Sequence, residues 1–78
     1  MLTEKGWRMK PLVFAEIGEE NTILKICGGS EVKEHLKKLG FHVGGTVTLI
    51  KYLSGDLIVT VRDSRIALDE SIARNIMI

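Results

Sequence analysis

Two histidines and one cysteine are the side chains of this sequence best suited to binding a metal: His35, His42 and Cys27. Imidazole nitrogen and thiolate sulfur are the ligands that zinc prefers in proteins. Such sites use pairs of ligands only a few residues apart, as in C-x-x-C or H-x-x-x-H, and neither pattern occurs here. We therefore predict no metal ligands, with Cys27 as a structural thiol at a strand end and both histidines solvated.

The other patterns that could support catalysis are paired glycines and adjacent acids. Gly28-Gly29 and Gly44-Gly45 could cradle a phosphate, but neither matches G-x-x-x-x-G-K-[ST] or G-x-G-x-x-G. Glu19-Glu20 is the clearest carboxylate pair, and its setting is that of a polar loop rather than a pocket. We predict no catalytic and no cofactor-binding residues, so the chain is not expected to be an enzyme.

The charge balance argues against nucleic acid as the main partner. Eleven basic and ten acidic residues leave a net charge of +1, which gives no strong field. Three lysines of a predicted helix are interleaved with Glu31 and Glu34, which is typical of a solvated helix face. A nucleic-acid-binding small barrel stays open as an alternative, and nucleic acid is not the expected partner.

Length, cysteine content and hydropathy limit the domain count and the location. A chain of 78 residues holds one small core, which we place in residues 11–78, with residues 1–10 as a loose arm around Trp7. One cysteine allows no intrachain disulfide, which favours a reducing, cytoplasmic setting. No apolar run approaches the roughly 20 residues of a membrane-spanning helix, so membrane insertion is not expected.

One helix is predicted to position the candidate residues at its two ends. Ser30–Leu39 offers Ser30 as an N-cap and an apolar stripe at Val32, Leu36 and Leu39. Gly40 stands where a left-handed residue ends many helices.

Strands are predicted around this helix from alternating apolar residues bounded by turn residues. Short strands joined by tight hairpins close into small barrels, so we expect a mainly β, SH3-like barrel of about five strands. Its one short helix follows the first strand, and an OB-fold is the alternative. The predicted strands are 21–27, 46–53, 57–62, 65–68 and 75–78. The side chains expected to point inward are Leu24, Ile26, Leu36, Leu39, Val47, Leu49, Val59, Val61, Ile66 and Leu68.

Several short motifs follow one another in order, and none of them is specific alone: Pro11-Leu12, Ala15–Glu19, Ile26, Gly28-Gly29, Leu39-Gly40-Phe41, Val43-Gly44, Thr46-Val47, Val59, Val61, Ser64–Leu68 and Ala73–Ile76. Together and in this order they resemble the FeoA family, the small cytoplasmic component of bacterial ferrous iron transport, over about residues 10–78. A related barrel occurs at the C-terminus of DtxR-like repressors. Val43 departs from the family pattern, because many members have proline there.

The resemblance implies a non-enzymatic accessory protein that binds FeoB, a membrane transporter with a cytoplasmic GTPase domain. It implies no tightly bound cofactor; a weak or transient contact with Fe(II) and a stand-alone metal-sensing role stay open.

The end of the predicted helix and the turn-rich connector after it, residues 41–45, are the expected partner surface, because turns there force apolar groups outward. One of Phe41 and Val43 is expected to stay exposed, with burial of both as the alternative. Alternation along the neighbouring strands adds two further outward side chains. The predicted partner-binding residues are Leu39, Gly40, Phe41, His42, Val43, Gly44, Tyr52 and Ile58.

Overall fold

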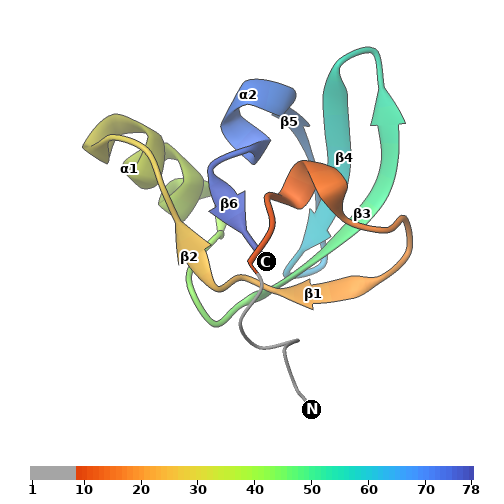
Figure 1. The fold of residues 1–78 in the computed structure, drawn as a ribbon, viewed down its shortest axis with the longest axis horizontal. Coiled ribbons are helices and arrows are strands. Elements are labelled where there is room, and N and C mark those ends of the chain that lie inside the picture. The colour runs from red at the N-terminus through yellow and green to blue at the C-terminus, as the bar shows by residue number, and fades with distance from the viewer. Residues whose placement is uncertain (1–8) are drawn as a thin grey trace.

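Residues 9–78 are described by a computed structural model, in which strands wrap around a single core (Figure 1). These residues form two sheets, one of four strands in the order β1-β3-β4-β5 and one of two strands, β2 and β6. The strands are β1 (Glu20–Thr22), β2 (Lys25–Ile26), β3 (Thr46–Leu53), β4 (Asp56–Val61), β5 (Ser64–Asp69) and β6 (Ile76–Met77). The helical elements are the 3₁₀ turn η2 (Leu12–Phe14), α1 (Ser30–Leu39) and α2 (Glu70–Ala73).

Strands β3, β4 and β5 form an antiparallel meander, whose pairing is regular between β4 and β5 and shifts at a bulge between Leu49 and Lys51 of β3. Two-residue loops join them, and both residues of each loop have positive φ, as type I′ hairpins require: Ser54-Gly55 and Arg62-Asp63. The alternate apolar side chains all point into the core, which confirms the inward orientation predicted for this half of the chain. They are Val47, Leu49, Leu57, Val59, Val61 and Leu68, while Ile66 is half-buried.

The single strand predicted over 21–27 is wrong, because this segment leaves one sheet and joins the other. Residues up to Thr22 pair with β3, whereas Lys25 and Ile26 pair with β6. Between them, Ile23 exchanges backbone hydrogen bonds with Gly44 and Gly45, both at 2.8 Å. This change of partner resets the alternation, so Ile23 is fully buried and Leu24, which was predicted inward, is 43% exposed. Two strands therefore precede α1, and Ile26 is half-buried against the core.

Helix α1 has the predicted bounds and places Leu36 in the core, with Val32 and Leu39 packed partly against it. Ser30 is its first helical residue rather than its N-cap, and the capping position belongs to Gly29, which has no side chain to accept a hydrogen bond. At the other end Gly40 has a φ of 104°, the left-handed conformation predicted for it.

The two ends of the domain are paired with each other. Lys10 and Ile78 exchange backbone hydrogen bonds of 3.0 and 2.8 Å, and Pro11 forms a bridge to Met77. The C-terminal strand is thus pinned into the fold as predicted, and Lys10, assigned to the arm from sequence, belongs to this pairing. The predictions for residues 1–8, including Trp7, lie outside the described residues.

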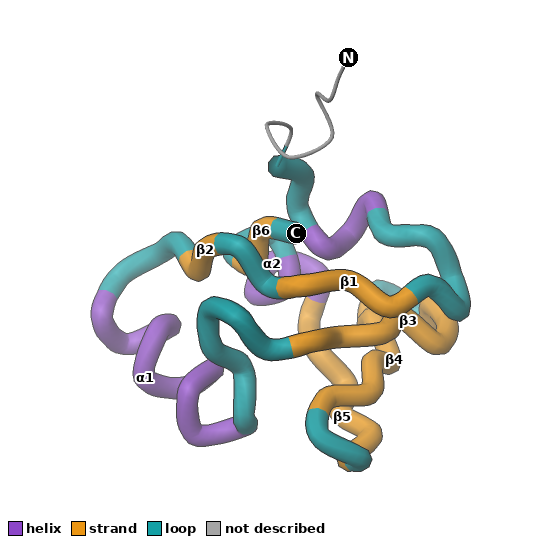
Figure 2. Tube along the Cα trace, turned by 90° about the horizontal axis from the view of Figure 1, so that it is seen from below, coloured by secondary structure: helices purple, strands orange, loops and turns teal. Residues whose placement is uncertain are grey.

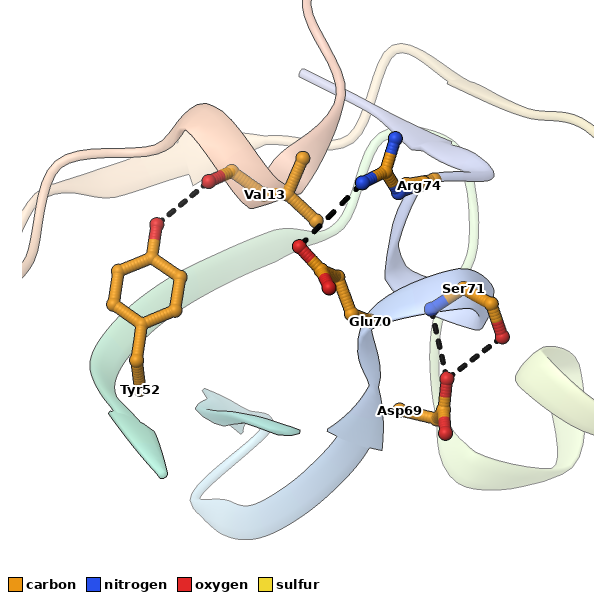
Figure 3. Close-up of polar contacts among 6 residues, drawn as sticks. All are labelled: Val13, Tyr52, Asp69, Glu70, Ser71 and Arg74. Carbon is orange, nitrogen blue, oxygen red and sulfur yellow. Dashed lines mark hydrogen bonds and ion pairs between the residues drawn. The ribbon is translucent and has the colours of Figure 1, made fainter. Parts of the chain in front are cut away.

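Side-chain hydrogen bonds fix η2 and α2 against the sheets (Figure 3). The Tyr52 hydroxyl on β3 donates to the backbone oxygen of Val13, at 2.6 Å. Asp69 caps α2, as its position predicted: its carboxylate accepts from the backbone N–H of Ser71 at 2.8 Å and from the Ser71 hydroxyl at 2.7 Å. These two bonds lower the pKa of Asp69 below its ordinary value of 3.8.

Candidate functional site

The connector after α1 begins with a C-terminal motif that turns Phe41 into the core. The backbone N–H of Phe41 donates to the oxygen of Leu36, and that of Gly40 donates to Lys37, which is the bonding pattern of a Schellman motif. The residue two places after such a helix end commonly packs its apolar side chain back on the last turn. Phe41 follows this rule and is fully buried.

Val43, in contrast, is exposed to solvent, because a second turn follows directly after Phe41. The N–H of Gly45 donates to the oxygen of His42 at 2.9 Å, and Gly44 has a φ of 93°, as in the third position of a type II turn. Val43 occupies the second position of this turn, its apex, and is 63% exposed. The sequence left open whether one or both side chains would be buried, and the structure leaves Val43 as the exposed one.

A groove opens beside this turn, between α1, β2 and the connector. Its volume is about 450 Å³, and apolar side chains contribute most of its wall. The backbone of the connector is held against the segment between β1 and β2 by the two hydrogen bonds between Ile23 and residues 44–45. The groove therefore has a rigid edge. The lining residues are Leu24, Lys25, Ile26, Lys33, Lys37, Phe41, His42 and Val43.

The groove is basic as well as apolar. Lys33 and Lys37 are neighbours one turn apart on α1, and Lys25 faces the same space from β2. Like charges at this helical spacing repel each other, by roughly the 0.2–0.5 kcal/mol that an opposite pair contributes. No aspartate or glutamate lines the groove along the described part of the chain. An occupant with negative charge and an apolar side chain would satisfy both features.

His42 is fixed at the rim by Arg62, which comes from the loop between β4 and β5. The Arg62 guanidinium lies 2.9 Å from the Nε2 atom of His42 and, being only a donor, requires that nitrogen to accept. Since an imidazole nitrogen in that role carries no proton, this contact presents His42 as a positioned, half-buried ring.

The structure divides the predicted partner residues into two groups. Phe41, His42 and Val43 line the groove, with Gly44 in the same turn and Leu39 and Gly40 half-buried just before it. Tyr52 and Ile58 lie elsewhere, in the hairpin half of β3 and β4, where Tyr52 is opposite Leu57 and Ile58 is opposite Lys51. Of this second group, Ile58 is half-buried and Tyr52 is tied to η2 by its hydroxyl.

Sequence reasoning missed the other wall of the groove, formed by Leu24, Lys25, Ile26, Lys33 and Lys37. Lys33 and Lys37 were recognised only as part of a solvated helix face, and Lys25 only as an outward residue of the predicted strand. No local signal marks this wall, because only the change of sheet at Ile23 makes Leu24 face outward.

The candidate metal ligands are not brought together. His35 is exposed on α1, Cys27 is half-buried beyond β2, and His42 is engaged with Arg62. Within residues 9–78 no three histidine, cysteine, aspartate or glutamate side chains cluster as a metal site would require. The helices described here are also too short or too polar to cross a bilayer.

Fold and site together define a small SH3-like barrel with an apolar groove edged by lysines. The solved structure of an iron uptake regulatory protein, FeoA, superimposes with a TM-score of 0.82 at 24% identity, covering 90% of this chain and 93% of that one. A Stenotrophomonas maltophilia FeoA complexed with zinc, described as an SH3 domain protein, superimposes with a TM-score of 0.73 at 21% identity, covering 85% of each chain.

The family follows from the sequence comparison. The model of the FeoA domain matches residues 10–78. A Methanocaldococcus jannaschii protein named "Putative Fe(2+) transport protein A" is 33% identical over 70 residues, which are 90% of this chain and 85% of that protein. The chain belongs to the FeoA domain family, which confirms the resemblance drawn from its sequence and the SH3-like fold expected from it.

Proposed function

We propose that this protein is a non-enzymatic accessory factor of ferrous iron transport. It works in the cytoplasm by binding the cytoplasmic GTPase-bearing part of a FeoB-type membrane transporter. The observation that carries the proposal is the family match over residues 10–78, joined to a rigid turn that holds an aliphatic side chain in solvent. Its relatives support the iron pathway, since one is named an Fe(2+) transport protein and another is described as a candidate ferrous iron transport activating factor.

The contact is proposed at the connector turn, residues 42–45, with Val43 at its apex. A side chain presented by a fixed turn loses little conformational entropy when it is buried by a partner. Arg62 fixes His42 on one side of the turn, and the hydrogen bonds to Ile23 fix Gly44 and Gly45 on the other. Nothing in this turn supplies a nucleophile with an adjacent base, so the chemistry on offer is binding.

Ferrous iron uptake in cells tests the proposal. In a strain that lacks this gene and keeps the transporter, the wild-type protein should restore uptake of labelled Fe(II), and the Val43→Ser variant should not. Leu53→Ser is the matched control, because Leu53 is an apolar residue of similar exposure, 52%, at the end of β3 away from the connector. Equal uptake with and without the wild-type protein would refute the transport role, whereas full rescue by Val43→Ser would refute the connector as its contact.

A further inference from the structure

The groove between α1, β2 and the connector specifies the chemistry of what can fill it. Its wall is mostly apolar, and Lys25, Lys33 and Lys37 surround it. A suitable occupant carries one aliphatic or aromatic side chain at the tip of a narrow projection, with carboxylates on either side. Such a ligand would bury the exposed apolar atoms and relieve the repulsion among the lysines at the same time.

The turn between η2 and β1 has this chemistry. Ile17 is 60% exposed at the apex of a turn in which Gly18 has a φ of 88° and the N–H of Glu19 donates to the oxygen of Glu16 at 3.2 Å. Glu16, Glu19 and the adjoining Glu20 are all exposed. We refer to residues 16–20 as the acidic turn.

The acidic turn is rigidly mounted. The N–H of Gly18 donates to the oxygen of Leu49 on β3 at 2.8 Å, and β1 continues directly into the four-stranded sheet. Ile17 is therefore an aliphatic knob on a fixed stem, built on the same plan as the Val43 turn. A preformed knob binds without a large ordering cost.

Within residues 9–78 neither charged cluster has an ion-pair partner. Over residues 9–78 the single ion pair joins Glu70 to Arg74, at 3.5 Å, and involves neither the groove lysines nor the acidic turn. Positive charge around a hollow and negative charge around a knob are thus both available to a neighbouring molecule.

The two features lie at opposite ends of the molecule. In Figure 1, α1 and β2 stand at the left end of the long axis, and the loop between η2 and β1 forms the right end. Figure 2, turned by 90°, shows the same separation. A molecule cannot place its own knob in its own groove, but successive molecules can do so in a row.

We propose that the groove binds the acidic turn of a second copy of this chain, with Ile17 entering the groove and the glutamates meeting the lysines. The contact is head-to-tail, so a dimer has a free groove on one molecule and a free knob on the other. Further copies can bind at either end, and assemblies can grow beyond a dimer. A single turn buries less than the roughly 1,000 Å² of a stable interface, so the association is weak and needs high protein concentration. The inference is independent of the transport role and goes beyond it.

Two variants, each damaged on one side only, test the proposal. The knob variant combines Ile17→Ser with Glu19→Gln and keeps the groove. The groove variant combines Lys25→Glu with Lys33→Glu and keeps the knob; glutamate at 33 is also well placed to pair with Lys37 on α1, so the helix is preserved. All four changed residues are exposed, Val43 is untouched in both, and thermal unfolding checks that each variant is folded.

In sedimentation velocity, the sedimentation coefficient of the wild type should rise with protein concentration up to the millimolar range. Added salt should reduce this rise, because it screens the attraction between glutamates and lysines. Each variant alone should associate at least about tenfold more weakly. An equimolar mixture should form a heterodimer and stop there, because it contains one intact groove and one intact knob. In the mixture, isotope-labelled knob variant should show amide shifts at residues 24–26 and 33–43. The Leu53→Ser control should behave as the wild type.

Three results would overturn the proposal. The wild type could remain monomeric at millimolar concentration, either variant alone could associate as the wild type does, or the mixture could show no heterodimer. The uptake assay is separate from all three, so failure of this inference leaves the transport role standing, and the reverse also holds.

Discussion

Two regions of the molecule bury their apolar side chains in different ways. One is the meander of β3, β4 and β5, and the other is the corner formed by β2, α1 and the connector. The meander has strands of six to eight residues joined by two-residue turns, and its alternate side chains fill the core except at the end of β3, where Tyr52 and Leu53 are exposed. The corner has a two-residue strand, and it leaves Leu24 and Val43 largely in solvent.

The difference teaches where binding surfaces can arise in so small a fold. A long hydrogen-bonded ladder fixes the whole strand, so every second side chain must face the core. The corner is held instead by one buried ring, Phe41, and by separate backbone hydrogen bonds such as those of Ile23. Between these anchors the chain is free to present apolar side chains outward, and a partner or a second copy can use them.

The largest effect is expected from Phe41→Ala, which removes the anchor of the corner. Loss of a fully buried phenylalanine costs about 3–5 kcal/mol. A domain of this length has a total stability of roughly 4–12 kcal/mol, so the variant should lose a quarter or more of that stability and unfold if the total lies at the low end. Urea unfolding followed by circular dichroism measures this. A loss below about 1 kcal/mol would show that the corner does not depend on Phe41.

The pair Ile23→Ala and Leu24→Ala tests the change of sheet. Ile23 is fully buried, so its truncation should cost about 2–5 kcal/mol, whereas truncation of the exposed Leu24 should cost less than about 1 kcal/mol. The same urea measurement compares the two. If Leu24→Ala were the more damaging change, the uninterrupted strand expected from the sequence would be right.

A smaller effect is expected from Tyr52→Phe, which keeps the ring and removes the hydroxyl that joins β3 to η2. The hydrogen bond to Val13 is partly buried, and such a bond contributes about 0.5–1.5 kcal/mol. The melting temperature should fall accordingly, and the hydrogen-exchange rates of the Phe14 and Ala15 amides should rise. An unchanged melting temperature would mean that η2 is held by Leu12 and Val13 packing alone.

The smallest effect is expected from Asp69→Asn, which changes how the stability of the protein depends on pH in acid. Because the pKa of Asp69 is lowered by its bonds to Ser71, the unfolded chain takes up the proton at higher pH than the folded chain. The stabilisation is complete above the ordinary pKa of 3.8 and is lost as the pH falls through the lower, folded value. Asp69→Asn should remove that part of the pH dependence. Identical acid-unfolding curves for the two proteins would contradict it.

The sequence predicted most of the meander because its signals are local. Alternation predicts the inward side chains of β4 and of β3 as far as Leu49. Beyond Leu49 a bulge before Lys51 shifts the register and places Tyr52, predicted outward, opposite the buried Leu57. The cap at Asp69 and the left-handed Gly40 are equally local, and both were predicted from residue type and position.

The errors lie where the structure depends on contacts distant in sequence. Residues 21–27 alternate like one strand, and only pairing with β3 on one side and β6 on the other breaks them at Ile23. The groove needs that break, so Leu24 and the three lysines could not be assigned to a site. The connector was predicted as a surface because turns are local, whereas Tyr52 and Ile58 were joined to it by alternation alone, which does not report distance along a sheet.

The most direct test of the proposed function is calorimetric titration of this protein with the purified cytoplasmic GTPase domain of the FeoB-type transporter. The wild type and Leu53→Ser should bind with the same affinity, and Val43→Ser should remain folded and bind at least about tenfold more weakly, as loss of a central apolar contact does. Absence of binding by the wild type, or equal binding by all three proteins, would contradict the account.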